Sequence, residues 1–267
     1  MTVARRLGGM ALRVVVLAGG LGTRLSEETE RVPKPMVEIG GMPMLWHIMK
    51  VYEAAAMQHF VVALGYKGEV VKRFFLDYRL MRADLTVKTR TGDVEVSGDR
   101  HEDWTVDLVD TGLTTNTGGR VRRLAPWLTD DLFCLTYGDG LCTVDLTELV
   151  AFHRTQGRLA TLTAIRPPAR FGGLVLDGPV VADFTEKPQI GEGWINGGFM
   201  VLDRSVIDRI EGDDASFESD VLEGLAADGQ LSAFRHEGFW QSMDTLRDVR
   251  TLQTLWDSGQ APWKAWT

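Results

Sequence analysis

The sequence has few cysteines, no long apolar run and no excess of positive charge. Its 267 residues include two cysteines, Cys134 and Cys142. They match no paired zinc spacing and cannot form a disulfide framework, so the low count predicts a reducing cytoplasm. No apolar stretch approaches the roughly 20 residues that cross a bilayer. The formal net charge is −8, so binding to nucleic acid or to an anionic membrane is not expected, and any bound anion must be held by a local group of cations.

Short apolar runs alternate with segments of helical periodicity along the chain. Apolar runs that predict buried strands stand at 14–17, 59–65, 131–137 and 159–165, and helical periods at 41–55, 68–78 and 144–157. Shorter and more polar strands are expected at 83–89, 92–97 and 103–112. Because strands and helices alternate, we expect an α/β fold, a three-layer sandwich with a mostly parallel sheet.

No internal repeat and no linker divides the chain, so we expect a single domain over residues 10–267. From about residue 170 the pattern becomes rich in strands and turns, which predicts a strand-rich C-terminal extension, and it closes with a helix near 245–258. Residues 1–9 contain two arginines but no apolar region of a signal peptide. We expect them to form a disordered extension.

The stretch VVVLAGGLGTRLSEETERVPKP, residues 14–35, places three glycines directly after a buried strand. Glycines leave backbone N–H groups uncovered, and ligands bind at the carboxyl ends of strands in open α/β sheets. Bare amides beside Arg24 and Lys34 suit a polyphosphate. A Walker A loop is excluded because no Gly-Lys-Ser/Thr follows Gly22. A dinucleotide-binding fingerprint is excluded because Leu25 stands where its last glycine would be. The alternative is a tight strand-to-helix turn with an incidental arginine.

This loop resembles the signature of sugar-1-phosphate nucleotidylyltransferases, which is Gly-Gly-x-Gly-x-Arg-Leu followed by Pro-Lys. Further stretches resemble the glucose-1-phosphate cytidylyltransferases of that family, among them YGDG at 137–140, FTEKP at 184–188, WINGG at 194–198 and GFWQSMD at 238–244. The resemblance covers about residues 10–266. It implies a Rossmann-like nucleotidyltransferase fold, in which the part from about residue 170 binds the sugar and completes the metal site. It also implies a homo-oligomer.

The resemblance implies the transfer of a cytidylyl group from CTP to α-D-glucose 1-phosphate, which gives CDP-glucose and pyrophosphate for deoxysugar biosynthesis. One alternative is a nucleotidylyltransferase that uses another nucleotide or sugar 1-phosphate. Another is a regulatory subunit that binds nucleotide sugar without turnover, which the presence of Arg24, Lys34 and Asp139 disfavours. The chain departs from the family pattern at Ala169, Met200 and Ser242, and we expect Met200 to lie close to the sugar site.

The expected chemistry needs cations and a metal ion more than it needs a base. The attacking phosphate oxygen is already an anion, so the site must chiefly neutralise two polyanions. Asp139 follows a buried strand and suits Mg²⁺, and the resemblance implies Asp244 as the second metal ligand. The alternative for Asp139 is a turn aspartate, and for Asp244 the N-cap of the helix that begins near Leu246. We therefore predict as catalytic residues Arg24, Lys34 and Asp139.

The resemblance also implies the two substrate sites. The sugar phosphate would be bound by Glu186, Lys187, Asn196 and Gly197, although a charged turn is the alternative for Glu186 and Lys187. The stretch TTNTGGR at 114–120 resembles the cytosine-binding segment of the family. His47, His153 and Trp240 are expected to have packing roles. The predicted nucleotide-binding residues are Leu17, Ala18, Gly19, Gly20, Gly22, Thr23, Arg24, Lys34, Thr115, Arg120 and Gly138.

Overall fold

The computed structural model describes most of the chain from Leu12 onward. It covers residues 12–20, 22, 32–98, 102–167, 173–177, 180–185 and 193–266, with the backbone alone for 173–177 and 180–185. The predicted extension at residues 1–9 lies outside the described residues. So do four predicted site residues, Thr23, Arg24, Glu186 and Lys187.

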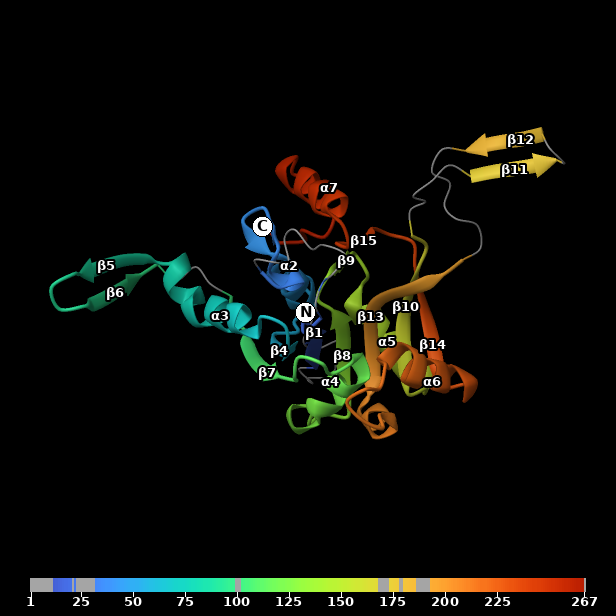
Figure 1. Ribbon diagram of the computed structural model, residues 1–267, viewed down its shortest axis with the longest axis horizontal. Coiled ribbons are helices and arrows are strands. Elements are labelled where there is room, and N and C mark those ends of the chain that lie inside the picture. Colours follow the sequence, from blue (N-terminus) through green and yellow to red (C-terminus); the bar gives the residue numbers. More distant parts are fainter. Residues whose placement is uncertain are drawn as a thin grey trace.

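A seven-stranded sheet forms the centre of the molecule (Figure 1). Its strands are β1 (Arg13–Leu17), β4 (His59–Leu64), β7 (Thr105–Asp110), β8 (Leu132–Tyr137), β10 (Ala160–Ile165), β13 (Ile195–Asp203) and β14 (Leu231–His236). Their order is β14-β10-β13-β8-β1-β4-β7. Only β13 runs antiparallel to its neighbours, β8 and β10, while the other four pairs are parallel. The mostly parallel sheet that the sequence predicts is therefore confirmed.

Helices cover both faces of this sheet. They are α2 (Met44–Glu53), α3 (Gly68–Arg82), α4 (Thr117–Arg123), α5 (Leu146–Gln156), α6 (Glu223–Ala227) and α7 (Leu246–Asp257). Alternate residues of β1 belong to different apolar clusters, since Val14 and Val16 pack in one and Val15 and Leu17 in the other. Side chains from α2, α3, α5 and α7 join the first cluster, and those from α4 and α6 join the second. This arrangement is the predicted three-layer α/β sandwich, and it explains why β1 is apolar and buried from Val14 to Leu17.

The region after residue 203 contains more helix than the sequence pattern indicates. Between β13 and β14 lie α6, a 3-10 helix (Arg204–Arg209) and a π-helix (Phe217–Leu222), where we expected strands and turns. The 3-10 and π turns do not repeat at 3.6 residues, so their apolar positions show no α-helical period. They are held by packing instead, with Val206, Phe217 and Leu225 fully buried.

Four two-stranded sheets flank the central one. They pair β2 (Glu38–Ile39) with β3 (Met42–Pro43), β5 (Asp84–Lys88) with β6 (Asp93–Ser97), β9 (Gly140–Cys142) with β15 (Trp240–Ser242), and β11 (Gly173–Asp177) with β12 (Val180–Thr185). The pair of β9 and β15 matters for function because it joins segments far apart in the sequence. Ser242 is the register partner of Gly140, and the amide of Met243 donates to the carbonyl of Asp139 over 2.8 Å.

The two helical histidines have the packing roles that the sequence predicts. His47 on α2 is fully buried, and its ring bonds the carbonyl of Ile39 through Nε2 at 2.8 Å while Nδ1 accepts from Trp263 Nε1 at 3.3 Å. Burial lowers the pKa of His47 to about 4, so the ring is neutral near pH 7. His153 bonds the hydroxyl of Thr161 on β10 at 3.0 Å. Among the described residues, no helix is both long and apolar enough for a membrane span.

Candidate active site

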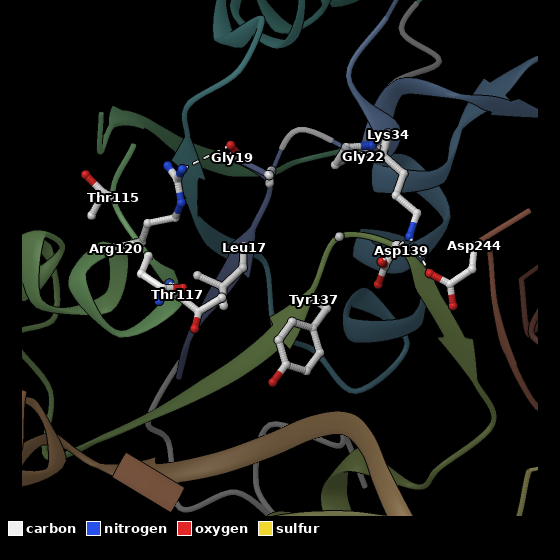
Figure 2. Close-up of a pocket in the computed structure, with 15 residues that line it drawn as sticks. Leu17, Gly19, Gly22, Lys34, Thr115, Thr117, Arg120, Tyr137, Asp139 and Asp244 are labelled. Atoms are coloured by element: carbon white, nitrogen blue, oxygen red, sulfur yellow. Dashed lines mark hydrogen bonds and ion pairs between the residues drawn. The ribbon is translucent and has the colours of Figure 1, made fainter. Parts of the chain in front are cut away.

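A pocket of about 400 Å³ opens at the carboxyl ends of β1 and β8 (Figure 2). Every predicted nucleotide-binding residue that the structure describes lines it, together with both predicted metal ligands. Five segments of the sequence therefore meet here: the end of β1 with the glycine loop, Lys34 with Pro35, the segment around the start of α4, the turn after β8, and Asp244. Its lining residues are Leu17, Ala18, Gly19, Gly20, Gly22, Lys34, Pro35, Thr115, Asn116, Thr117, Arg120, Tyr137, Gly138, Asp139 and Asp244.

Two glycines of the pocket are required because the chain approaches them closely. A Cβ atom on Gly19 would lie 2.2 Å from Nη1 of Arg120. A Cβ atom on Gly138 would lie 2.8 Å from Pro35 Cγ and 2.9 Å from the carbonyl oxygen of Leu17. Gly138 also donates its amide to that carbonyl over 3.0 Å. The turn after β8 is thus hydrogen-bonded to the end of β1.

Lys34 connects the two predicted metal ligands. It begins the 3-10 helix Lys34–Met36, with Pro33 as the preceding residue and Pro35 as the next, so its backbone has little freedom. Its Nζ lies 2.5 Å from Asp139 Oδ2 and 2.8 Å from Asp244 Oδ1 (Figure 2). Burial alone would lower the pKa of Lys34, but the two carboxylates outweigh burial and raise it. The lysine is therefore positively charged at this site.

The same contacts test whether Asp139 and Asp244 can share a metal ion. Both carboxylates reach one ammonium nitrogen, so both already surround a common position for positive charge. Within the described part of the chain, no cluster of three or more His, Cys, Asp or Glu side chains could hold a metal ion. The two carboxylates that share this position fit an ion that binds through one or two protein carboxylates, as Mg²⁺ commonly does.

The helix α7 is capped by Thr245 and not by Asp244. The hydroxyl of Thr245 accepts from the amide of Asp248, and the carboxylate of Asp248 accepts from the amide of Thr245. This is a complete capping box. The alternative in which Asp244 serves as the N-cap is therefore wrong, and its carboxylate points to Lys34.

Arg120 lies deeper than a phosphate-binding arginine would be expected to lie. It is 5% exposed, and its guanidinium donates to the carbonyls of Gly19 and Leu64 at 3.0 and 3.1 Å. It also donates to the hydroxyl of Thr111 and to the carbonyl of Gly112 at 2.7 and 2.8 Å. Burial lowers the pKa of Arg120. Its guanidinium thus joins the glycine loop to the ends of β4 and β7, and both of its terminal nitrogens already donate to protein oxygens.

A smaller pocket of about 40 Å³ adjoins the first one and contains the predicted sugar residues Asn196 and Gly197. Tyr137 and Asp139 line both pockets, which places the predicted sugar site beside the predicted metal ligands. Trp240 also lines the smaller pocket, and its Nε1 donates to the carbonyl of Gly197 at 2.8 Å. Trp240 packs against the first apolar cluster, as the sequence predicts, and it is also part of the candidate site.

Met200 does not reach this pocket. It is 1% exposed and packs in the apolar cluster on the face of β13 opposite to Phe199, which does line the pocket. The expectation that Met200 lies at the sugar site is thus corrected, because successive residues of a strand point to opposite faces.

Sequence reasoning missed several residues of the site. Asn116 and Thr117 lie within the segment 114–120, which resembles a cytosine-binding segment. Their position in this segment could have identified them. Tyr137 directly precedes Gly138 and could have been found in the same way. Glu218, which bonds Tyr137 and Thr117, stands in a stretch without any recognisable motif, and no sequence signal identifies it.

Comparison with known proteins agrees with this geometry. A family model described as nucleotidyl transferase matches residues 13–261. A glucose-1-phosphate cytidylyltransferase of Salmonella typhi is 50% identical over 256 residues, which is 96% of this chain and 100% of that protein. A Bacillus subtilis protein named as a probable glucose-1-phosphate cytidylyltransferase is 41% identical, with the same coverage of 96% and 100%.

The fold is also found in solved structures. The crystal structure of HddC from Yersinia pseudotuberculosis matches with a TM-score of 0.68 and 24% identity, over 92% of this chain and 99% of that one. At this identity the likeness shows the fold alone. The family match and the two curated relatives go further, and the chain belongs to the nucleotidyl transferase family, within which it groups with the glucose-1-phosphate cytidylyltransferases.

Proposed function

We propose that the protein transfers a cytidylyl group from CTP to α-D-glucose 1-phosphate and releases CDP-glucose and pyrophosphate. One observation carries the proposal. Two carboxylates, 105 and 210 residues from Lys34, surround its ammonium group at the mouth of a glycine-lined pocket. The names of the relatives that are 50% and 41% identical support CTP and glucose 1-phosphate as the substrates. A nucleotidylyltransferase that uses another nucleotide or sugar phosphate is the alternative.

The reaction as proposed needs no side-chain base. An anionic phosphate oxygen of glucose 1-phosphate attacks the α-phosphorus of CTP, the new phosphorus–oxygen bond forms, and the bond to pyrophosphate breaks. The residues around Lys34 would counter the charge that gathers on the phosphates, and backbone amides of the glycine loop would orient the triphosphate. We assign to Arg24 a second cationic role at the same phosphates, on the basis of the family signature.

Nucleotidyl transferases of this family generally use a divalent metal ion. We propose Mg²⁺, held by Asp139 and Asp244, which when bound would neutralise phosphate charge. Lys34 would then turn from the carboxylates toward the triphosphate, because its ammonium group now occupies the position between them. Asn196 and Gly197, with Glu186 and Lys187, are proposed to hold the sugar phosphate.

We further propose that the protein acts in the cytoplasm as a homo-oligomer, and that its product feeds deoxysugar biosynthesis. The membership of the chain in its family supports the oligomer and the pathway, and the low cysteine count supports the cytoplasm. Size-exclusion chromatography with light scattering would measure the oligomeric state.

The function is tested by incubating the purified protein with Mg²⁺ and pairs of substrates, and by measuring pyrophosphate release. CTP, UTP, dTTP and GTP would each be combined with glucose 1-phosphate and with mannose 1-phosphate. We expect the largest kcat/KM for CTP with glucose 1-phosphate. Equal use of CTP and UTP would contradict the cytidylyl assignment and leave the nucleotidylyltransferase class, whereas no release with any pair would contradict both.

A further inference from the structure

One carboxylate outside both pockets bonds a wall residue of each. Glu218 lies in the π-helix Phe217–Leu222 and lines neither pocket. Its Oε1 accepts a hydrogen bond from Tyr137 Oη at 2.5 Å, and its Oε2 accepts one from Thr117 Oγ1 at 2.7 Å. The hydroxyl of Ser216 donates to the same Oε2 at 3.0 Å. Three hydroxyl groups therefore converge on this side chain.

The protonation states fix the direction of these bonds. Burial alone would raise the pKa of Glu218, but the bonds from Tyr137 and Thr117 outweigh it and lower the pKa, so the carboxylate is ionised and accepts only. The phenol of Tyr137 is the donor in its bond to this carboxylate. Within the residues that the structure describes, no lysine or arginine forms an ion pair with Glu218. The hydroxyls are the groups that stabilise its charge.

Tyr137 forms the wall that the two pockets share. It is the last residue of β8, directly before Gly138 and Asp139, and it lines both pockets. Figure 2 shows its ring at the larger pocket. On the side of the sugar pocket, a Cβ atom on Gly198 would lie 2.7 Å from Cδ2 of Tyr137. The edge of the ring thus packs against Gly198 of β13, and its hydroxyl is bonded by Glu218.

Thr117 is held just as closely on the nucleotide side. Its hydroxyl donates to Glu218 and accepts from the amide of Phe217 at 2.9 Å. Next to it, the amides of Gly118 and Gly119 both donate to the carbonyl of Ala215, at 2.9 and 3.2 Å. The first turn of α4 is therefore fastened to the segment that carries Glu218.

We propose that Glu218 is a positioning residue, which holds the nucleotide wall through Thr117 and the sugar wall through Tyr137 so that the two substrates meet in line. This inference rests on the proposed function. An oxygen that attacks phosphorus must lie opposite the leaving pyrophosphate, and a misplacement of about 1 Å can cost on the order of a hundredfold in rate. Thr117 and Tyr137 bond the same carboxylate. A shift of that carboxylate therefore changes the position of one substrate relative to the other more than it changes the affinity for either substrate. The π-helical turn agrees with this role, since such turns are frequent at functional sites.

The experiment compares Glu218→Ala, Tyr137→Phe and the double variant with the unmutated protein. We expect kcat to fall by about 30- to 100-fold in Glu218→Ala and about tenfold in Tyr137→Phe, while the Kd of CTP, measured by calorimetry, changes less than about threefold. Because both changes remove the same hydrogen bond, the double variant should be no slower than Glu218→Ala alone. A role in stability alone would lower Tm without this split between kcat and Kd.

Ser216→Ala is the matched control. It removes the third hydroxyl from the same carboxylate, and the hydroxyl that accepts from the amide of Ser219, but it touches neither pocket wall. We expect a lower Tm and a kcat within about twofold of the unmutated protein. The inference is overturned if Glu218→Ala keeps its kcat, if the two losses multiply in the double variant, or if Ser216→Ala is as slow as Glu218→Ala.

The comparison uses whichever nucleotide and sugar phosphate the unmutated protein turns over best. If that pair is not CTP with glucose 1-phosphate, the proposed substrates are wrong while the positioning role is still measured. A protein that turns over no pair would overturn both.

Discussion

Replacing Lys34 with alanine should strengthen the binding of divalent metal and at the same time weaken catalysis. The ammonium group of Lys34 lies 2.5 Å from Asp139 and 2.8 Å from Asp244. A metal ion that uses both carboxylates must displace it. Two unit charges about 4 Å apart attract by about 4 kcal/mol at an effective dielectric constant near 20.

Solvent reduces this attraction, because the side chains of Asp139 and Asp244 are 33% and 21% exposed. If about 1.4 kcal/mol of this attraction has to be given up when a metal ion binds, the metal affinity falls tenfold. We therefore expect Lys34→Ala to bind Mn²⁺ at least about tenfold more tightly than the unmutated protein does, when no nucleotide is present. With CTP, the same variant should lose several hundredfold in kcat/KM, or about 3.5 kcal/mol of transition-state stabilisation.

Mn²⁺ binding is measured from the free-ion signal in electron paramagnetic resonance, and kcat/KM from pyrophosphate release. Lys34→Arg is the first control, because it keeps a cation between the carboxylates and should leave Mn²⁺ affinity close to that of the unmutated protein. Lys88→Ala, on the exposed β5–β6 hairpin, makes the same change in net charge away from the site. An unchanged or weaker Mn²⁺ affinity in Lys34→Ala would refute the competition between lysine and metal.

Further predictions concern the metal ligands, the base and the buried histidine. Asp139→Asn should reduce kcat by more than tenfold with an unchanged Tm, since it removes a charge at the proposed metal site, and a smaller loss would contradict the metal role. Asp244→Asn should likewise lose activity with an unchanged Tm, because Thr245 caps α7, whereas a drop in Tm with normal kcat would contradict this assignment. Thr115 lines the nucleotide pocket, and we expect at least about tenfold preference for CTP over UTP that narrows in Thr115→Val if its hydroxyl accepts from the cytosine amine. The pKa of His47 is about 4 in the folded protein and near 6.5 in an unfolded chain, so the unfolded state gains the proton first as the pH falls. Between pH 7.5 and 5, the unmutated protein should therefore lose about 2 kcal/mol more of its unfolding free energy than His47→Gln loses. Denaturant titration at both pH values measures this difference, and equal losses would contradict the burial argument.

The sequence by itself determined the layers of the fold and one half of the active site. The apolar run of β1 and the alternation of strands with helices predict a parallel sheet covered on both faces, because both are properties of consecutive residues. The glycine loop and Lys34 between two prolines are equally local. The predicted nucleotide-binding residues that the structure describes came from this local pattern and from the resemblance to the family, and all of them line one pocket.

Only the tertiary structure decided which distant groups meet. Asp244 reaches Lys34 because β15 pairs with β9, a contact between segments about a hundred residues apart that leaves no periodic pattern in the sequence. Arg120 carries a charge that suggests phosphate, but its buried position and its carbonyl partners depend on where three loops end. Glu218 bonds Tyr137, 81 residues away, and Thr117, 101 residues away. Propensity and periodicity act over a few residues, whereas each of these contacts depends on how whole elements pack.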